Sequence, residues 1–421
     1  MAEEDIYGSK KTFDRFKGGY KKLLDRSNKN TYYCKNKNNK KYFEHIFKLE
    51  HSAGNSYIRL NCYINLLKKI CTFTNKELST IDKTKDRDEI NKIQIEVNKT
   101  INESGRQRFP RDIKKLWKDI FPVKEKNGEV NEDMIPYVVR HLKYRMDKSK
   151  EKVRKDKLSP NEVKNILNYF SNKLNFKSYL ELLYYGFARP QELSYTKIKD
   201  LELEDDYGKL QISEHGKEGT KFIEIIDSFP TVLNWYNQHP FKDKKNEFFF
   251  FNNYNKQLTP FAVNKQLKLA CKKLGIAKPI TCYSFKRNGI THALLSGESH
   301  TVVEKRAGWT STKQIATYDL SEHEDSFKIQ LAKRGMLKGK EKDKYKDYIN
   351  NLKTKRCVFC DKLNESTNLS CSNCKRSLDR DNIKDNLLDK DDADKVLKLI
   401  MKLKELDPNL LKKAKEEAGL S

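Results

Sequence analysis

Four short segments between residues 186 and 318 combine cationic side chains with a hydroxyl that could act as a nucleophile. In chain order they are Gly186–Leu193, which contains Arg189, then His215–Lys217, Tyr283–Arg287, and Ala307–Ser311 followed by Tyr318. Fixed cations can stabilise developing negative charge, and a tyrosine hydroxyl can form a covalent intermediate. Each segment alone also fits an ordinary role, such as a salt-bridged arginine, a turn lysine or a core tryptophan. Their order and spacing together favour a joint chemical role.

Four cysteines near the C-terminus have the spacing of metal ligands. Cys357-x-x-Cys360 and Cys371-x-x-Cys374 are separated by ten residues. Two such pairs complete a closed tetrahedral site, which predicts one structural zinc ion with no open position for catalysis. The sequence does not indicate whether DNA, a protein or another subunit contacts this ribbon. The other five cysteines are scattered, as reduced core or surface residues are.

The charge of the chain favours a polyanionic partner. Lys and Arg number 86 against 59 Asp and Glu, which gives a formal net charge of +27 that runs through most of the sequence. Nucleic acid is the expected partner, and a merely lysine-rich surface is the alternative. The apolar runs are too short for a membrane span, and residues 1–20 lack an apolar signal region. We therefore expect a soluble, cytoplasmic protein without a membrane partner.

The first part of the chain reads as an arm followed by a helical domain. Residues 1–41 are rich in Lys and Asn and predict a basic N-terminal arm or an irregular helix. In residues 42–146 the apolar residues recur at three- and four-residue steps, as in Ile58–Ile70 and Ile113–Ile120, with a polar break at Ser104–Pro110. Residues 147–157 hold six basic and three acidic side chains, which is typical of a linker that is either solvated or follows a phosphate backbone.

A second domain is predicted over residues 158–340. Ser159 and Pro160 suit the start of a helix. Three strands follow within an otherwise helical pattern, at Leu201–Leu203, Lys209–Ser213 and Lys221–Ile226. Residues 349–380 form the cysteine ribbon, and residues 381–421 contain a last amphipathic helix. The fold class is therefore mainly α (α+β): a helical domain, a mixed domain with a small antiparallel sheet, and a zinc ribbon.

The ordered segments resemble the active site of the tyrosine recombinases, the family of phage integrases and Xer-type recombinases, and in detail its archaeal integrases. The motif around the family's first arginine, Gly-x-x-Arg-x-x-Glu-Leu, is matched in full by Gly186, Arg189, Glu192 and Leu193. The resemblance covers about residues 42–335, where the first domain is similar to the family's core-binding (SAM-like) domain and the second to its catalytic domain. Some archaeal integrases end in a similar CxxC ribbon.

The hairpin and C-terminal motifs of the family also have counterparts. The family's hairpin lysine lies in a Gly-Lys turn, here Gly216-Lys217, and Lys221 is a second candidate. Its final motif places the nucleophilic tyrosine nine residues after a His or Trp, as Trp309 and Tyr318 are placed.

The family's third motif, His-x-x-Arg, is altered in this chain, and two registers compete. One register puts Tyr283 in the histidine position and Lys286 in the arginine position. The other puts Ser284 and Arg287 there. Bidentate phosphate binding suits arginine and favours Arg287, whereas the alignment of the neighbouring apolar residue and the following glycine favours Lys286. Neither register supplies the usual histidine.

The resemblance implies a recombinase or integrase that needs no metal or other cofactor for catalysis. Tyr318 would attack a DNA phosphodiester to form a 3′-phosphotyrosyl link, and Lys217 would protonate the leaving 5′-oxygen. Arg189, with Arg287 or Lys286, would stabilise the phosphate, and Trp309 would donate its indole N–H. A catalytically weakened accessory DNA-binding protein and an enzyme similar to type IB topoisomerases are the alternatives.

The resemblance further implies double-stranded DNA as the partner, gripped by both domains, and a homo-oligomer that forms a tetramer on paired sites. The enzyme would then be associated with the nucleoid. The last helix, at Asp391–Leu406, would pack on a neighbouring subunit as in relatives, or equally on its own.

Overall fold

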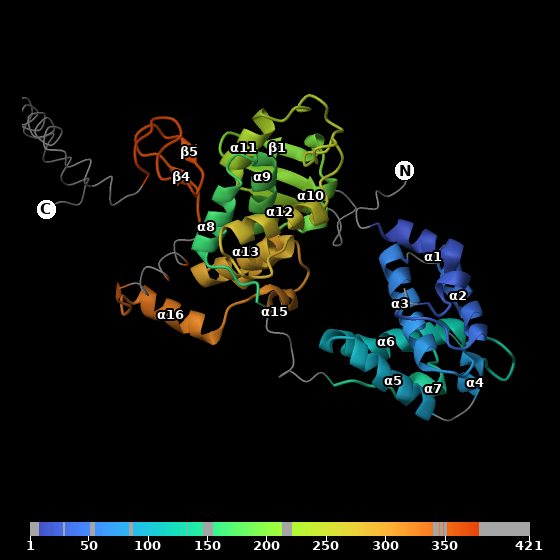
Figure 1. Ribbon diagram of the computed structural model, residues 1–421. Helices are drawn as coiled ribbons and strands as arrows, with labels where there is room; N and C mark the ends of the chain where they lie inside the picture. Colours follow the sequence, from blue (N-terminus) through green and yellow to red (C-terminus); the bar gives the residue numbers. More distant parts are fainter. Residues whose placement is uncertain are drawn as a thin grey trace, which may run out of the picture. The chain divides into compact units, whose positions relative to one another are not determined.

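The protein consists of two compact units, Met1–Val153 and Arg154–Ser421. The computed structural model describes residues 8–27, 30–50, 55–83, 87–131, 133–145, 155–212, 221–339, 345, 348 and 352–378. In Figure 1 the first unit runs from blue to teal, and the second from green to red. We call them the helical unit and the catalytic unit, and each is described by itself.

The helical unit is built from helices around one apolar core. Its elements are α1 (Ser9–Leu23), η1 (Lys37–Tyr42), α2 (Phe43–Lys48), α3 (Tyr57–Phe73), α4 (Leu78–Lys83), α5 (Asp88–Thr100), α6 (Glu103–Ile120) and α7 (Tyr137–Arg140). Ser56 caps α3, where its hydroxyl accepts from the backbone N–H of Arg59. The predicted helices at Ile58–Ile70 and Ile113–Ile120 lie inside α3 and α6.

The described part of the predicted N-terminal arm belongs to this core. Phe13 and Phe16 of α1 are buried in the same cluster as Phe43 and Leu60. The arm and the helical domain, which the sequence divides at residue 41, therefore share one core. The reason is that one face of the highly charged α1 carries aromatic residues at helical spacing. The expected break at Ser104–Pro110 is also absent: α6 is continuous, and Pro110 is buried within it.

The catalytic unit combines helices with a small sheet. Its helices are α8 (Pro160–Tyr169), α9 (Leu174–Tyr184), α10 (Pro190–Tyr195), η3 (Ile198–Asp200), α11 (Phe229–Asn237), α12 (Pro260–Lys273), α13 (Cys282–Ser296), α14 (His300–Ala307), η4 (Thr312–Gln314), α15 (Ile315–Tyr318) and α16 (His323–Lys333). The antiparallel sheet has the order β1 (Leu201–Leu203), β2 (Gly208–Ile212), β3 (Lys221–Ile225). All three strands were predicted, to within one residue at each end.

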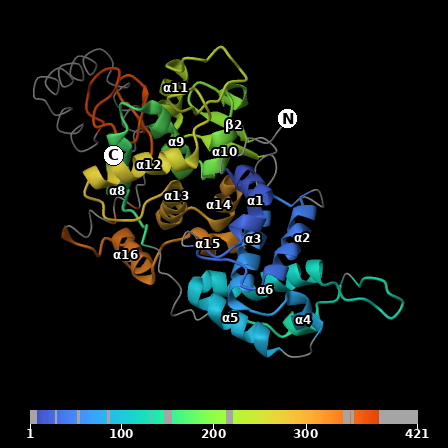
Figure 2. The ribbon, with the colours of Figure 1, turned by 45° about the vertical axis from the view of Figure 1, so that its right-hand side comes forward.

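Helix α13 lies in the middle of the catalytic unit and packs closely on α9 (Figure 1). A Cβ atom at Gly289 would lie 2.0 Å from the backbone oxygen of Tyr184, so only glycine permits this approach. Figure 2 shows α14 and α15 on the same side of the unit as α13. The elements that carry the third and fourth sequence motifs are therefore neighbours.

The cysteine segment forms a ribbon with two short strands, β4 (Lys355–Arg356) and β5 (Leu363–Asn364), paired antiparallel. Leu352 and Leu363 pack against the main core of the catalytic unit. The predicted last helix at Asp391–Leu406 lies outside the described residues, as does most of the predicted linker.

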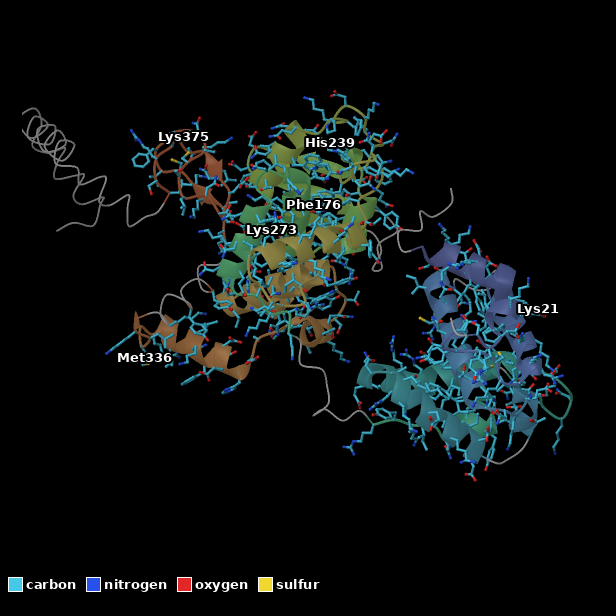
Figure 3. All side chains as sticks on the ribbon, viewed as in Figure 1. Lys21, Phe176, His239, Lys273, Met336 and Lys375 are labelled. Atoms are coloured by element: carbon cyan, nitrogen blue, oxygen red, sulfur yellow. The ribbon has the colours of Figure 1, made fainter. Side chains whose placement is uncertain are left out.

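Cationic side chains are spread over both units (Figure 3), for example Lys21 after α1 starts, Lys273 at the end of α12 and Lys375 in the ribbon. Within the part of the chain that the structure describes, none of the helices has the length and apolar character needed to cross a membrane.

Candidate active site and metal site

A small apolar cluster joins the elements that carry the first, third and fourth sequence motifs. It is formed by buried residues from the loop after α9, from α13 and α14, from the loop after α14, and from α15: Phe187, Ile290, Ala293, Val303, Ala307, Trp309 and Ile315. Tyr318 packs against it and is partly exposed. Tyr318 thus lies at the edge of this apolar cluster, where a large substrate can reach it.

Arg189 is held at the start of α10 by a carboxylate of its own motif. Its Nη1 donates to Glu192 Oε1 at 3.0 Å, and its backbone N–H donates to Glu192 Oε2 at 2.7 Å. Burial raises the pKa of Glu192, but Lys221, Lys286 and Arg189 outweigh this effect and lower it below its usual value. Glu192 is therefore ionised, and it fixes the orientation of the Arg189 side chain.

Lys286 is fully buried and lies against the two aromatic residues of the last motif. Its Nζ donates to the backbone oxygen of Phe187 at 2.6 Å. The same atom lies 5.7 Å from the centre of the Trp309 ring and 5.4 Å from that of Tyr318. Burying a charge this deeply is costly unless polar or charged groups compensate it, which is typical of functional sites.

Arg287 faces another part of the unit. Its guanidinium forms an ion pair with Asp156, with Nε 3.1 Å from Oδ2, and lies beside the Ser284 hydroxyl. The structure therefore differs from the preference for Arg287 as the second phosphate-facing cation. The physical reason is that the guanidinium is already engaged by Asp156, whereas Lys286, one position earlier, faces Trp309 and Tyr318.

Tyr283 lies one helical turn before Lys286, and its ring is 36% exposed. Burial raises the pKa of its hydroxyl, the neighbouring Tyr318 raises it further, and Arg189 opposes both. Arg287 also lowers the pKa of Tyr283, so Tyr283 lies within the electrostatic influence of Arg189, Tyr318 and Arg287. Tyr283 and Lys286 thus lie on one face of α13. They are the two residues that the first of the predicted registers assigns to the histidine and arginine positions.

Trp309 and Tyr318 form an aromatic pair with ring centroids 5.0 Å apart. The indole Nε1 of Trp309 is buried and has no hydrogen-bond acceptor among the described residues. A buried donor without a partner is costly, so it indicates an acceptor supplied by a ligand. Gly308 precedes the pair with φ +67, and a Cβ there would lie 2.5 Å from Lys221 Cδ.

The structure describes only the second of the two candidate hairpin lysines. Lys217, the first candidate, lies outside the described residues. Lys221, the second candidate, starts β3, and its Nζ contacts Glu192 Oε2 at 3.2 Å and donates to the backbone oxygen of Ala307 at 3.1 Å. The structure thus brings Arg189, Lys221 and Lys286 around the Glu192 carboxylate.

The four predicted metal ligands come together in the ribbon. Their Sγ atoms all lie within 4.8 Å of one another: Cys357, Cys360, Cys371 and Cys374. The backbone N–H of Asp361 donates to Cys357 O at 2.9 Å, and that of Lys375 donates to Cys371 O at 3.0 Å, so both pairs form the same tight turn. Burial raises the pKa of Cys371, but the N–H groups of Cys374 and Asn373 lower it, to about 6 in total. Four converging sulfur donors suit a tetrahedral ion such as Zn²⁺.

The model of the phage integrase family matches residues 156–324. The chain is also 32% identical over 154 residues to the tyrosine recombinases XerD of Listeria innocua and of Listeria monocytogenes, which covers 34% of this chain and 50% of each relative. Residues 156–324 are thus a phage integrase domain. The alignment thus spans about half the length of the curated relatives that it matches.

Solved recombinase structures share the fold. XerH site-specific recombinase, solved with a palindromic difH substrate in a post-cleavage complex, has a TM-score of 0.54 at 14% identity, over 79% of this chain and 96% of that chain. The Tn1549 transposon integrase, in complex with transposon right end DNA, has a TM-score of 0.52 at 11% identity, over 70% and 99% of the two chains. At these identities the similarity concerns the fold alone.

Sequence reasoning missed a second set of contacts in this phage integrase domain. A polar stripe of α13 binds the segment that enters the domain, with Ser284 and Asn288 bonded to Asp156, and Asn288 and His292 bonded to Leu158. The four-residue spacing of Ser284, Asn288 and His292, which places them on one face of the helix, was the available signal.

Proposed function

We propose that this protein is a site-specific DNA recombinase or integrase that breaks and rejoins DNA through a 3′-phosphotyrosyl link to Tyr318. The observation that carries the proposal is the buried Lys286 ammonium, 5.4 Å from the Tyr318 ring and 5.7 Å from that of Trp309. A fixed cation beside a partly exposed tyrosine suits attack on a phosphodiester, where negative charge develops on the phosphate oxygens.

Each side chain of the site has a role in this reaction. The Tyr318 oxygen attacks phosphorus, the bond to the 5′-oxygen breaks, and the link to the enzyme keeps the energy for rejoining. Arg189 and Lys286 stabilise the non-bridging oxygens, and the unpartnered Trp309 Nε1 donates to one of them. Tyr283 takes the place of the family's histidine and contributes a hydroxyl to the same phosphate. The reaction consumes no cofactor.

A lysine must protonate the leaving 5′-oxygen. Lys217 holds the position of the family's hairpin lysine, and Lys221 lies in the site beside Glu192. Because Glu192 and the Ala307 oxygen already hold the Lys221 ammonium, we assign Lys217 the role of general acid and Lys221 that of a fixed positive charge.

Double-stranded DNA is the proposed partner, bound by both units mainly through phosphate contacts. The net charge of +27 supports this, and affinity should fall steeply as salt rises. Strand exchange needs two DNA sites, which implies a tetramer on paired DNA. We expect the protein in the cytoplasm, associated with the nucleoid. The four cysteines hold one structural zinc ion, which is supported by their converging sulfur atoms.

A nicked suicide DNA substrate tests the proposal. Purified protein should form an adduct that migrates slowly on a denaturing gel, and Tyr318→Phe should abolish it. Tyr254→Phe is the matched control, because Tyr254 is 83% exposed and lies far along the chain from every site residue. An adduct that persists in Tyr318→Phe would reject this nucleophile.

The altered third motif favours one other function, that of an accessory DNA-binding protein with weakened catalysis. The site has Tyr283 and Lys286 where the family has histidine and arginine. Salt-sensitive DNA binding without any adduct on a verified substrate would support this second function. Relaxation of supercoiled DNA without strand exchange would instead indicate an enzyme similar to type IB topoisomerases.

A further inference from the structure

The ribbon is joined to α9 by a small number of buried polar contacts. Lys177 of α9 forms an ion pair with Glu365, and the Lys177 side chain is 2% exposed. The hydroxyl of Tyr185, which follows α9 directly, lies 2.8 Å from that of Ser366. Both contacting ribbon residues lie between the two CxxC pairs.

One face of α9 is polar and buried, and the ribbon contacts it at both ends. Lys177, Glu181 and Tyr185 follow one another at four-residue steps, and all three are buried. Burial raises the pKa of Glu181 to about 8, although Lys177 lowers it, and Glu365 adds to the increase. At neutral pH Glu181 is therefore protonated, so the single ammonium of Lys177 pairs with the ribbon carboxylate.

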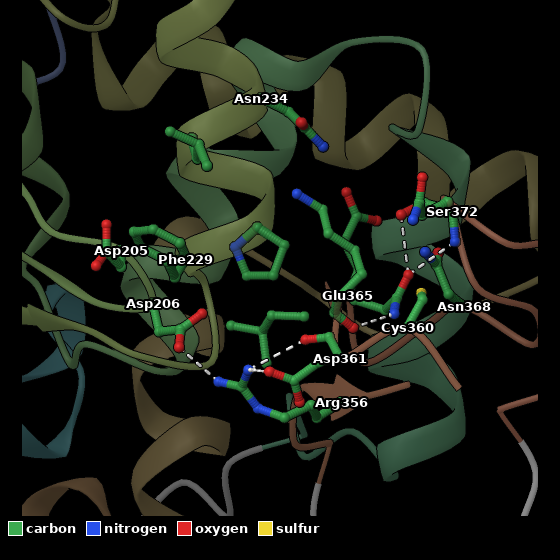
Figure 4. Close-up of a pocket in the computed structure, with 16 residues that line it drawn as sticks. Asp205, Asp206, Phe229, Asn234, Arg356, Cys360, Asp361, Glu365, Asn368 and Ser372 are labelled. Carbon is green, nitrogen blue, oxygen red and sulfur yellow. Dashed lines mark hydrogen bonds and ion pairs between the residues drawn. The ribbon is translucent and has the colours of Figure 1, made fainter. Parts of the chain in front are cut away.

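The rest of the junction combines the apolar contacts of Leu352 and Leu363 with an open cavity. A cavity of about 450 Å³ lies between α11 and the ribbon, and Figure 4 shows its lining. Arg356 bridges it with an ion pair to Asp206 at 2.6 Å. The backbone N–H of Thr354 donates to Asp227 Oδ1 at 2.9 Å. The ribbon is thus attached by discrete contacts around this cavity.

The contact at Tyr185 leads directly to the active site. Tyr185 is followed by Phe187, which has φ 52 and accepts the hydrogen bond from Lys286, and then by Arg189. The Tyr185 backbone oxygen accepts from Arg306 of α14 at 2.5 Å. Residues 185–189, the active-site loop, are therefore held by α13 and α14 on one side and by the ribbon at the Tyr185 hydroxyl.

The position of Ser366, which contacts Tyr185, depends on the four metal-ligating cysteines, which we call the cysteine cage. Asn364 Nδ2 lies 3.6 Å from Cys371 Sγ, and Asn364 Oδ1 accepts from the backbone N–H of Ser372 at 2.8 Å. The segment Asn364–Ser366 is thus bonded to the second CxxC turn. The ribbon's own core is little more than the cysteines and Leu378, so its shape requires the metal.

We propose that the metal-bound ribbon is a positioning element for the active-site loop, acting through Ser366 on Tyr185 and through Glu365 on Lys177. Ser366, Tyr185, Glu365 and Lys177 are positioning residues, since none of them touches the reacting atoms. The consequence for catalysis rests on the proposed function, whereas the effect on the loop does not.

Hydrogen exchange tests the effect on the loop without any need for activity. In the full-length protein, amides of residues 186–189 should exchange about tenfold faster in Ser366→Ala and after chelation of the metal, because a lost hydrogen bond shifts an opening equilibrium by about this factor. Ser370→Ala is the matched control, since Ser370 is an exposed serine of the same ribbon. Unchanged exchange of the loop in Ser366→Ala and after chelation would overturn the inference, whether or not the protein cleaves DNA.

Cleavage kinetics test the consequence. Tyr185→Phe and Ser366→Ala should each slow single-turnover adduct formation by about fivefold to tenfold, with an unchanged Kd for DNA, and the double variant should be no slower than either, because both remove one hydrogen bond. A weaker Kd with an unchanged rate would overturn the inference and make the ribbon a DNA-binding module. Absence of any adduct in the wild-type protein would reject the proposed function, while the exchange experiment would still decide on the positioning role.

Discussion

Lys286 and Arg287 are neighbours in the sequence, yet their charged groups serve different parts of the catalytic unit. We expect Lys286→Met to lower the rate of adduct formation by about a hundredfold to a thousandfold, as the loss of a fixed electrostatic group does in other sites. Lys286→Arg should retain most of the activity, because it keeps the charge. Single-turnover cleavage measures both effects, and thermal unfolding should change little in the arginine variant.

Arg287→Met should lower the free energy of unfolding, because it leaves the buried Asp156 carboxylate without its cation. Burial raises the pKa of Asp156, and Arg287 and Ser284 lower it below its usual value. Losing one partner of such a pair costs about 3 kcal/mol of unfolding free energy, measured by denaturant titration. A variant that cleaves poorly yet unfolds like the wild type would instead place Arg287 at the phosphate.

The assignment of the general acid can be decided with a substrate whose leaving oxygen is replaced by sulfur. A thiolate leaves without protonation, so a variant that lacks only the proton donor regains its rate on this substrate. We expect Lys217→Ala to be slow on the normal substrate and to be restored on the 5′-thio substrate. Lys221→Ala should be slow on both, because it removes a charge near Glu192 and Gly308. Restoration of Lys221→Ala instead would exchange the two roles.

At the scale of elements, α13 connects the active site to the segment that enters the catalytic unit. His292 is buried on this helix, where its Nε2 bonds to the Leu158 oxygen at 2.8 Å and its Nδ1 to the Tyr184 hydroxyl at 2.6 Å. Burial lowers the pKa of His292 from 6.5 to about 4, an effect that the Leu158 oxygen opposes and Lys157 increases.

This shift predicts a pH dependence of stability. The unfolded chain binds a proton at this histidine below pH 6.5, and the folded chain only near pH 4, so stability is lost as pH falls through this window. The loss amounts to about 3 kcal/mol of unfolding free energy. Denaturant titrations at pH 7 and pH 4.5 should show a smaller difference for His292→Gln than for the wild type. His323→Gln, at an exposed histidine, should match the wild type.

The elements that the sequence predicts well are those whose signal is local. The strands, the cysteine cage and the order of the active-site motifs follow from short-range spacing, and the structure has the strands and the cage. The choice between Lys286 and Arg287 could not be made in this way, because the Arg287 side chain bonds to Asp156, which lies 131 positions earlier in the chain. The ribbon's contact with Tyr185 spans 181 positions and had no local signal. Residues 9–23 were predicted as part of an arm because of their high charge, although their aromatic residues lie on one face of α1 and pack in the core.

In an oligomer of the whole molecule, a DNA phosphate could be attacked by Tyr318 of the subunit that binds it or by Tyr318 of a neighbouring subunit. Tyr318 packs on Trp309 and Lys286 of its own chain, so among the described residues one subunit brings the nucleophile and its neighbouring cation together. We therefore expect cleavage in cis, in which each subunit attacks the phosphate that its own Arg189 and Lys286 stabilise.

Mixed oligomers test this expectation. Tyr318→Phe lacks the nucleophile, and Lys286→Met lacks a cation but keeps Tyr318. If subunits exchanged tyrosines, a mixture of the two variants would contain complete sites and would regain adduct formation. In the cis arrangement every subunit of the mixture remains defective, and adduct formation stays at the level of Lys286→Met alone. Recovery of untagged Lys286→Met subunits together with tagged Tyr318→Phe subunits on DNA controls for mixed assembly. Adducts in the mixture of the two variants would show that Tyr318 leaves its packing on Trp309 to reach a neighbouring subunit.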